Sequence, residues 1–197
     1  MATLHLASAL LRKAVTSVTD RPAKSTERLD RASASQLYAW IFVGPDVLFT
    51  DTGCGSSLSV GSFLNAWAMS PDDFDCVINC CPREGTLPRP RTHLLDLADT
   101  DDVSLEPILP ALETALADAR RVMATAGGRV LCHCWMGASR SVAVAIYLLC
   151  RIYGHEAYDS PEDAFMHYYC SFKRCRPCIN VGVQLMREVC RVLRQTS

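Results

Sequence analysis

The chain has 197 residues, of which 49% belong to the hydrophobic set AVILMFWYC, and this is enough for the core of a single domain. Its 20 Lys and Arg against 21 Asp and Glu give a net charge of −1 without a long run of either sign, which excludes a general nucleic-acid binder. The apolar runs fall short of the ~20 residues that a membrane span requires, so we expect no transmembrane helix.

The first 36 residues hold a predicted helix and a linker. Apolar and small side chains recur at spacings of three and four, which predicts a helix with one narrow apolar stripe formed by Leu4, Ala7, Leu11, Ala14 and Val18. Residues 20–36 are polar and lack a period, as is typical of a linker. We therefore predict a helix at 1–20, a linker at 21–36 and one domain at 37–197.

Short apolar segments predict strands in the first half of that domain. These segments lie at 40–43, 47–49, 75–79 and 93–98. Gly44-Pro45-Asp46 favours a turn between the first two strands. The stretch from Asp51 to Ser62 is rich in Gly and Ser, which predicts a loop.

The second half of the domain has longer helical patterns and one more strand. Apolar residues at helical spacing predict helices at 104–126, 139–153 and 160–173, and a last helix that buries Met186, Val189, Cys190 and Leu193. A buried strand is predicted from Arg129 to His133. Because strands alternate with helices, we expect an α/β fold with a central, mostly parallel sheet flanked by helices.

The cysteines indicate a reducing environment. Eleven is an odd number, and a chain of this length builds a core without disulfides, so we expect free thiols and a cytoplasmic protein. The first positive charges follow the apolar N-terminal run, whereas a secretory signal places them first. A zinc site is disfavoured because only Cys175-x2-Cys178 has ligand spacing and no second pair matches it. We expect neither a metal nor a cofactor.

The loop between the last predicted strand and the helix after it carries the clearest chemical signal. It reads His-Cys-Trp-Met-Gly-Ala-Ser-Arg-Ser over residues 133–141. It combines a strand that fixes the loop, Gly137 where the backbone crowds, and a helix whose positive end points back at the loop. A second pair with the same Cys-to-Arg spacing, Cys170 and Arg176, falls inside or at the end of a helix, and we interpret it as coincidental.

Such a loop activates a thiol and binds a phosphate with the same groups. The N–H groups of residues 135–140, the helix dipole and the Arg140 charge favour the thiolate form of Cys134 near neutral pH. Arg140 offers a planar fork for two phosphate oxygens, so we expect Cys134 to attack phosphorus and form a phosphocysteine. Ser141 would then hydrogen-bond the leaving sulfur. The residues expected to line the phosphate site are His133, which orients the loop, Trp135, Met136, Gly137, Ala138 and Ser139.

The leaving oxygen needs a proton, which a carboxylic acid on a separate loop usually supplies. Asp99 directly follows a predicted strand, whereas Asp102 has the more usual chain separation from the nucleophile. We favour Asp99 as the general acid, with Asp102 as its rival and Asp101 behind both. An acid without this role would stabilise the N-terminus of the helix that follows Ser104.

At these residues the chain resembles the dual-specificity protein phosphatases of the cysteine-dependent class, whose signature is His-Cys-x5-Arg-Ser. The resemblance covers about residues 37–195, and it includes Val77-Ile78-Asn79, Leu95 to Asp99, Gly128 to Leu131 and Ile179-Asn180. It implies the phosphatase fold, a shallow pocket, and hydrolysis of phosphotyrosine and phosphoserine or phosphothreonine. The loop near Cys54 has no counterpart that we can name in the family.

Within this family the chain is most similar to the poxviral virion phosphatases, in which a leading helix is exchanged between two subunits. This resemblance implies a homodimer through residues 4–18, whose apolar stripe the partner would cover. It also implies a location in the cytoplasm of an infected host cell and in the virion.

The variable positions of the loop favour phosphorylated proteins as substrates and partners. Trp135, Met136 and Ala138 are apolar, whereas a pocket for several phosphates would add lysines there. Phosphoinositides and RNA 5′-phosphates are the alternative substrates. From a different functional class, a phosphate-dependent binding or scaffold protein without turnover is the other alternative; Cys134 argues against it, because binding needs only the arginine and the amides.

Overall fold

The computed structural model describes residues 45–84, 91–100 and 102–196. The chain divides into two units, residues 1–38 and 39–197, and every described residue belongs to the second. The predicted helix at 4–18, the linker at 21–36, the strand at 40–43 and Asp101 lie outside the described residues, so these expectations stay predictions.

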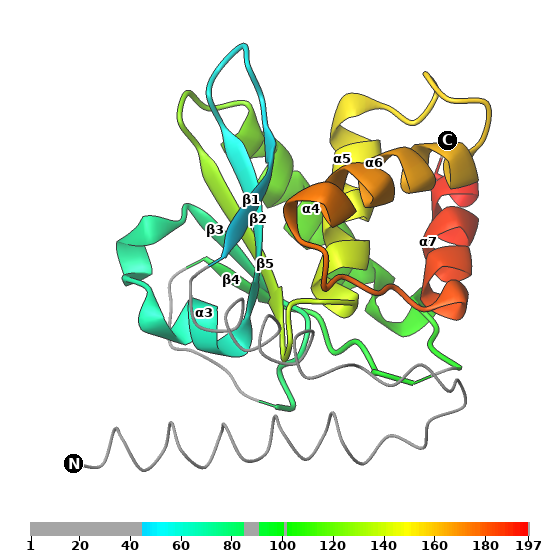
Figure 1. The fold of residues 1–197 in the computed structure, drawn as a ribbon, viewed down its shortest axis with the longest axis horizontal. Helices are drawn as coiled ribbons and strands as arrows, with labels where there is room; N and C mark the ends of the chain where they lie inside the picture. The colour runs from blue at the N-terminus through cyan, green and yellow to red at the C-terminus, as the bar shows by residue number, and fades with distance from the viewer. Residues whose placement is uncertain (1–44, 85–90, 101, 197) are drawn as a thin grey trace. The chain divides into compact units, whose positions relative to one another are not determined.

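The centre of the described part is a mixed sheet of five strands in the order β1-β2-β5-β3-β4 (Figure 1). The strands are β1 (Asp46–Thr50), β2 (Ser57–Ser62), β3 (Cys76–Asn79), β4 (Thr92–Leu94) and β5 (Arg129–Cys134). Only the β1–β2 pair is antiparallel, and the other three neighbouring pairs are parallel. The expected α/β fold with a mostly parallel sheet is confirmed.

The predicted loop from Asp51 to Ser62 is wrong in its second half, because residues 57–62 form β2. This strand pairs with β5 in parallel, with Ser62 opposite Cys134. Its small side chains have a packing reason: a Cβ on Gly61 would lie 3.1 Å from the Cβ of Pro45 and 3.2 Å from the Cβ of Asn65. Because the strand is crowded, small residues such as Gly and Ser fit there. The same residues are common in turns, which is why the sequence predicts a loop at this buried strand.

The strand predicted at 93–98 is shorter in the structure. β4 ends at Leu94, and residues 95–99 continue without regular pairing. Leu95 and Leu97 are nevertheless buried, at 0% and 3% exposure. Their alternation with polar residues therefore reflects packing of an irregular segment against the core, and it does not require a ladder of hydrogen bonds.

Four helices pack on one side of the sheet, and the short helix α3 lies on the other (Figure 1). They are α4 (Leu109–Met123), α5 (Arg140–Tyr153), α6 (Pro161–Cys175) and α7 (Val183–Gln195), with α3 at Phe63–Ala68. The four helices confirm the predicted helical segments, although α4 begins after a 3₁₀ turn at Glu106–Ile108. Helix α3 was not predicted; it begins at a capping box in which Ser62 Oγ accepts the Asn65 N–H.

Helix α5 is the centre of the core. It contacts β2, β5 and all three other long helices, and residues 140–150 are all buried. Because no face of its middle part reaches water, the side chains from Val142 to Cys150 are apolar on every side of the helix. The 133–141 loop is therefore supported on both sides, by β5 where it begins and by the first turn of α5 where it ends.

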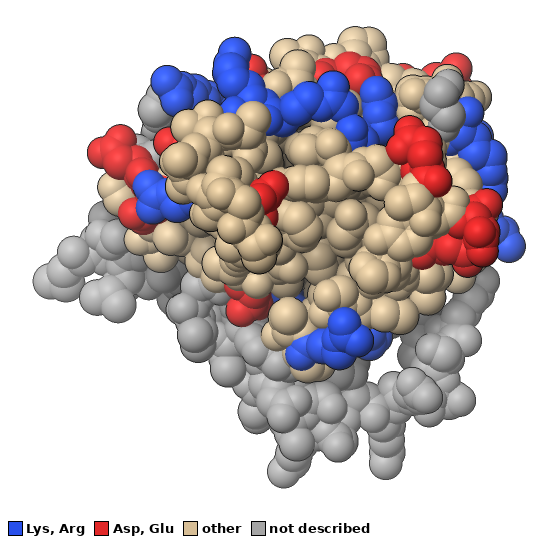
Figure 2. All heavy atoms as spheres, turned by 90° about the horizontal axis from the view of Figure 1, so that it is seen from above, with Lys and Arg blue, Asp and Glu red and all other residues tan. Residues whose placement is uncertain are grey.

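The surface seen from above carries both signs of charge around a broad uncharged area (Figure 2). Lys and Arg form a band along one edge of this face, and Asp and Glu interrupt it. Among the described helices, none has the length and apolar character needed to cross a bilayer.

Candidate active site

Cys134 lies at the carboxyl end of β5, where the chain turns into the loop before α5. Its side chain is buried, with 2% of the residue exposed. The Gly137 N–H donates to Cys134 Sγ across 3.3 Å, and Ser141 Oγ lies 3.2 Å from the same sulfur. The structure thus brings together Cys134, Gly137 and Ser141, as the sequence predicted. The sulfur is thus contacted by a backbone N–H and by a hydroxyl group from the first turn of α5.

The loop can turn this sharply only with glycine at position 137. Gly137 has φ +68°, in the left-handed region. A Cβ on this residue would lie 2.6 Å from both the carbonyl carbon and oxygen of Gly61 and 2.8 Å from Ser62 N. The end of β2 therefore packs directly against the loop and sets its position.

Arg140 is the first residue of α5, and only 4% of it is exposed. Its Nη1 donates to Glu84 Oε1 at 2.9 Å and to the Leu97 carbonyl oxygen at 3.3 Å. Burial acts to lower the pKa of Arg140, but Cys134, Asp99 and Glu84 outweigh it, and the pKa is raised above its usual range. The guanidinium therefore stays charged beside the thiol.

Glu84 is a member of this site that the sequence reasoning missed. It lies in the turn that follows β3, and both of its carboxylate oxygens are within 3.2 Å of Arg140 Nη1. The signal was present but general: β3 and β5 are parallel neighbours, and residues after the carboxyl ends of such strands meet at one edge. No spacing in the sequence distinguishes Glu84 from the other acids.

Of the candidate acids that the structure describes, Asp99 forms an ion pair with Arg140. Asp99 Oδ2 lies 3.7 Å from Arg140 Nη2, and the Asp99 side chain is 43% exposed. Asp102 is exposed in the turn before the 3₁₀ segment. The structure therefore places Asp99 beside the loop and within reach of solvent, an arrangement suited to proton transfer at the mouth of a pocket.

The remaining residues of the loop form its outer wall. Trp135, Met136, Ala138 and Ser139 are half-buried, while His133 is buried. The Trp135 ring stacks on Phe63 of α3, with centroids 5.7 Å apart. The loop thus presents an apolar rim beside the charged pair of Arg140 and Glu84.

The other buried cysteines near Cys134 lack its environment. Burial raises the pKa values of Cys80, Cys81 and Cys132, so these thiols stay protonated at neutral pH. All eleven cysteines are free. In the ranges that the structure describes, no group of three or more His, Cys, Asp or Glu is placed to hold a metal ion.

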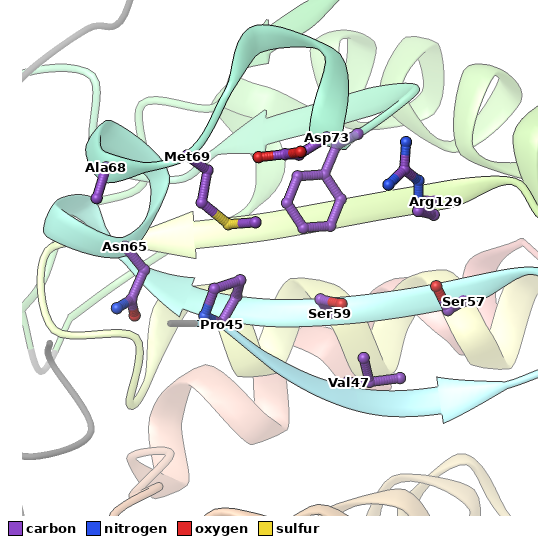
Figure 3. A pocket seen from close by; sticks show the side chains of 10 residues that line it. Pro45, Val47, Ser57, Ser59, Asn65, Ala68, Met69, Asp73 and Arg129 are labelled. Atoms are coloured by element: carbon purple, nitrogen blue, oxygen red, sulfur yellow. The ribbon is translucent and has the colours of Figure 1, made fainter. Parts of the chain in front are cut away.

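A pocket of about 480 Å³ lies elsewhere, over β1, β2 and β5 beside α3 (Figure 3). Its charged lining residues are Asp73 and Arg129, at the end of the sheet where β5 begins. No residue of the 133–141 loop lines it. The groups suited to phosphoryl transfer are therefore gathered around Cys134 and not in this pocket.

Comparison with solved structures identifies the fold of the described domain. No family model matches the chain, and no curated protein matches it. The phosphatase domain of Yvh1 from Chaetomium thermophilum superposes with a TM-score of 0.59 at 18% identity, covering 77% of this chain and 96% of that one. DUSP15 gives 0.56 at 14% identity, with 78% and 94% covered.

A third similar structure is viral. OH1 from the Orf virus, described as a tyrosine phosphatase with triple substrate specificity, gives a TM-score of 0.51 at 20% identity, with 77% of this chain and 86% of that chain covered. Together these structures show that the described domain has the fold of the dual-specificity phosphatases.

Proposed function

We propose, from this fold and the geometry of the loop, that the protein hydrolyses phosphotyrosine and phosphoserine or phosphothreonine in proteins. The observation that carries the proposal is the buried Cys134 thiol, which accepts the Gly137 N–H at 3.3 Å and lies at the start of the helix that begins with Arg140. Strand, glycine, helix N-terminus and arginine favour the same anionic sulfur, which is the nucleophile that phosphoryl transfer needs.

In the first step, the Cys134 thiolate attacks phosphorus in line with the leaving oxygen. The S–P bond forms as the P–O bond breaks, and Asp99 gives its proton to the leaving alcohol or phenol. Arg140 holds two of the three equatorial oxygens. Glu84 engages Nη1 of Arg140 and so fixes the plane of the guanidinium. Nε and Nη2 are the donors for the phosphate, with Nη2 exchanging its contact with Asp99 Oδ2 for a phosphate oxygen as Asp99 turns to the leaving group.

In the second step, water attacks the phosphocysteine. Asp99, now a carboxylate, takes the proton of the water, the S–P bond breaks, and inorganic phosphate leaves. Ser141 Oγ lies 3.2 Å from Cys134 Sγ and donates a hydrogen bond to the sulfur as it regains its negative charge. The thiolate is then ready for another cycle.

The rim of the loop supports proteins as the substrate class. Trp135, Met136 and Ala138 are apolar and half-exposed, so they suit the side chains that flank a phosphorylated residue. A lipid or RNA end with several phosphates needs additional cations around the pocket. Instead, two acidic side chains from other segments, Glu84 and Asp99, lie close to Arg140, which disfavours a second phosphate.

Turnover on three substrate classes tests whether proteins are the preferred substrates. We expect phosphopeptides to be hydrolysed faster than phosphoinositides and triphosphate-ended RNA, with vanadate inhibiting the reaction. Faster turnover of RNA would reverse the proposal. No turnover on any of the three, together with tight binding of phosphopeptide by the unmodified protein, would establish the scaffold alternative.

We further propose that the protein is a homodimer through residues 4–18 and works in the cytoplasm of an infected host cell. The apolar stripe of that segment supports the dimer, because an uncovered stripe is unfavourable in water. The similarity of the fold to a viral phosphatase supports the location.

A further inference from the structure

Three backbone carbonyls of the loop are held from outside by donors from two other parts of the domain. The Trp135 oxygen accepts the Phe63 N–H at the start of α3, at 3.2 Å. The Gly137 oxygen accepts Arg176 Nε at 3.0 Å. The Ala138 oxygen accepts the Asn180 N–H at 2.8 Å. Two of these donors come from the segment that joins α6 to α7.

These contacts fix the direction of the N–H groups that follow. A trans peptide is planar, and its N–H points opposite to its C=O. A donor that holds the Gly137 carbonyl from outside therefore turns the Ala138 N–H toward the opposite, concave side of the loop. The Asn180 contact does the same for the Ser139 N–H. The concave side is where the Cys134 sulfur accepts the Gly137 N–H.

Among the three donors, Arg176 is the unusual one. It is the largest of the fully buried side chains, with 0% exposure. Its Nη1 forms an ion pair with Asp46 at the start of β1, while its Nε holds the Gly137 carbonyl. The guanidinium thus connects the edge strand to the phosphate loop.

Packing alone does not account for an arginine at this position. Burying a guanidinium is unfavourable unless its donors are paired, and an apolar side chain of similar volume packs as well or better. Among the described residues, Arg176 Nη2 has no hydrogen-bond partner. A buried donor left unpaired costs stability, so the contact with the Gly137 carbonyl needs a reason beyond stability.

We propose that Arg176 is a positioning residue for phosphoryl transfer, holding the Gly137–Ala138 peptide so that the Ala138 N–H faces the sulfur and the bound phosphate. This inference rests on the proposed function. It also gives a role to the arginine of the second Cys-x5-Arg pair: Cys170 is exposed on α6, whereas Arg176 acts on the loop around Cys134 from behind.

Alkylation of Cys134 by iodoacetamide, followed across pH by mass spectrometry of its peptide, tests the inference without requiring turnover. Arg176→Met removes the donors and the charge, and Arg176→Lys keeps the charge but loses the planar fork. We expect the midpoint of the pH profile to rise by about one unit in Arg176→Met, with alkylation at pH 6 about tenfold slower. Arg176→Lys is expected to change in the same direction.

Arg151→Met is the matched control for lost stability. Arg151 Nη1 pairs with Glu113 at 2.8 Å near the far end of α5, away from the loop. Its loss should lower the melting temperature without moving the alkylation midpoint. If Arg176→Met does not fold, Arg176→Lys measured against this control still decides the question.

Three results would overturn the inference, and they distinguish its failure from a failure of the proposed function. If the wild-type midpoint is low and both Arg176 variants have the same midpoint, the positioning role is removed while the phosphatase proposal stands. The same conclusion follows if Arg176→Met raises the midpoint but Arg176→Lys has the wild-type value. A wild-type midpoint near the ordinary cysteine value of about 8.5 would contradict both.

Discussion

Replacing Gly137 by alanine adds one methyl group where the loop meets the end of β2. The new Cβ would lie 2.6 Å from the carbonyl carbon and oxygen of Gly61. These are backbone atoms of a strand that is paired on both sides, so they cannot rotate away as a flexible side chain would. Relief of the overlap therefore requires the loop itself to move.

Two costs add in Gly137→Ala. An alanine at φ +68° is unfavourable by about 1–2 kcal/mol, and overpacking in a rigid core adds roughly 1–3 kcal/mol. Gly127 separates these costs, because it has φ +69° and a Cβ added there would meet no other atom within 4 Å. Gly127→Ala should therefore lose only the first, about 1–2 kcal/mol.

Urea denaturation and steady-state kinetics on a phosphopeptide measure both effects. We expect Gly137→Ala to be less stable than Gly127→Ala, and its kcat/KM to fall about 10²-fold, since a displacement of about 1 Å at a reacting group has that effect. Gly127→Ala should keep wild-type kcat/KM. Equal stability losses with unchanged kcat/KM in both variants would refute the idea that β2 sets the position of the loop.

Three further predictions concern the reaction and the assembly. Cys134→Ser should abolish hydrolysis while still retaining phosphopeptide in a pull-down, and residual turnover in this variant would exclude Cys134 as the nucleophile. Asp99→Asn should lower kcat about 10²–10⁴-fold on a substrate with a poor leaving group and much less on a nitrophenyl phosphate. If Asp102→Asn shows this pattern and Asp99→Asn does not, Asp102 is the general acid. Deletion of residues 1–20 should halve the mass found by sedimentation, and an unchanged mass would contradict the dimer.

The parts of the site that the sequence predicts are those whose signals are local. A buried strand, a glycine and an apolar helix follow one another within residues 129–153, so their order alone places Cys134 before a helix N-terminus. The same holds for the start of the helix predicted at 160–173, where Ser160 Oγ accepts the Asp163 N–H at 3.1 Å as the N-cap of α6. Neighbouring residues determine such features.

The missed parts depend on contacts between distant segments. Strand β2 has small residues because the loop and α3 crowd it, and that crowding exists only in the fold. Glu84 and Arg176 approach the loop from segments that are far away in the sequence. Their residue types are ordinary, so only the order of strands in the sheet and the path of the α6–α7 connection bring them to the site.

The shell of protonated thiols around the loop has a consequence for covalent ligands. Because burial raises the pKa values of Cys80 and Cys81, an electrophilic compound that reaches the 133–141 loop would find Cys134 as the reactive sulfur there. Off-site labelling would instead come from Cys170 and Cys175, which are exposed. Chemists seeking a selective covalent inhibitor would therefore optimise shape at the rim and keep the intrinsic reactivity of the warhead low.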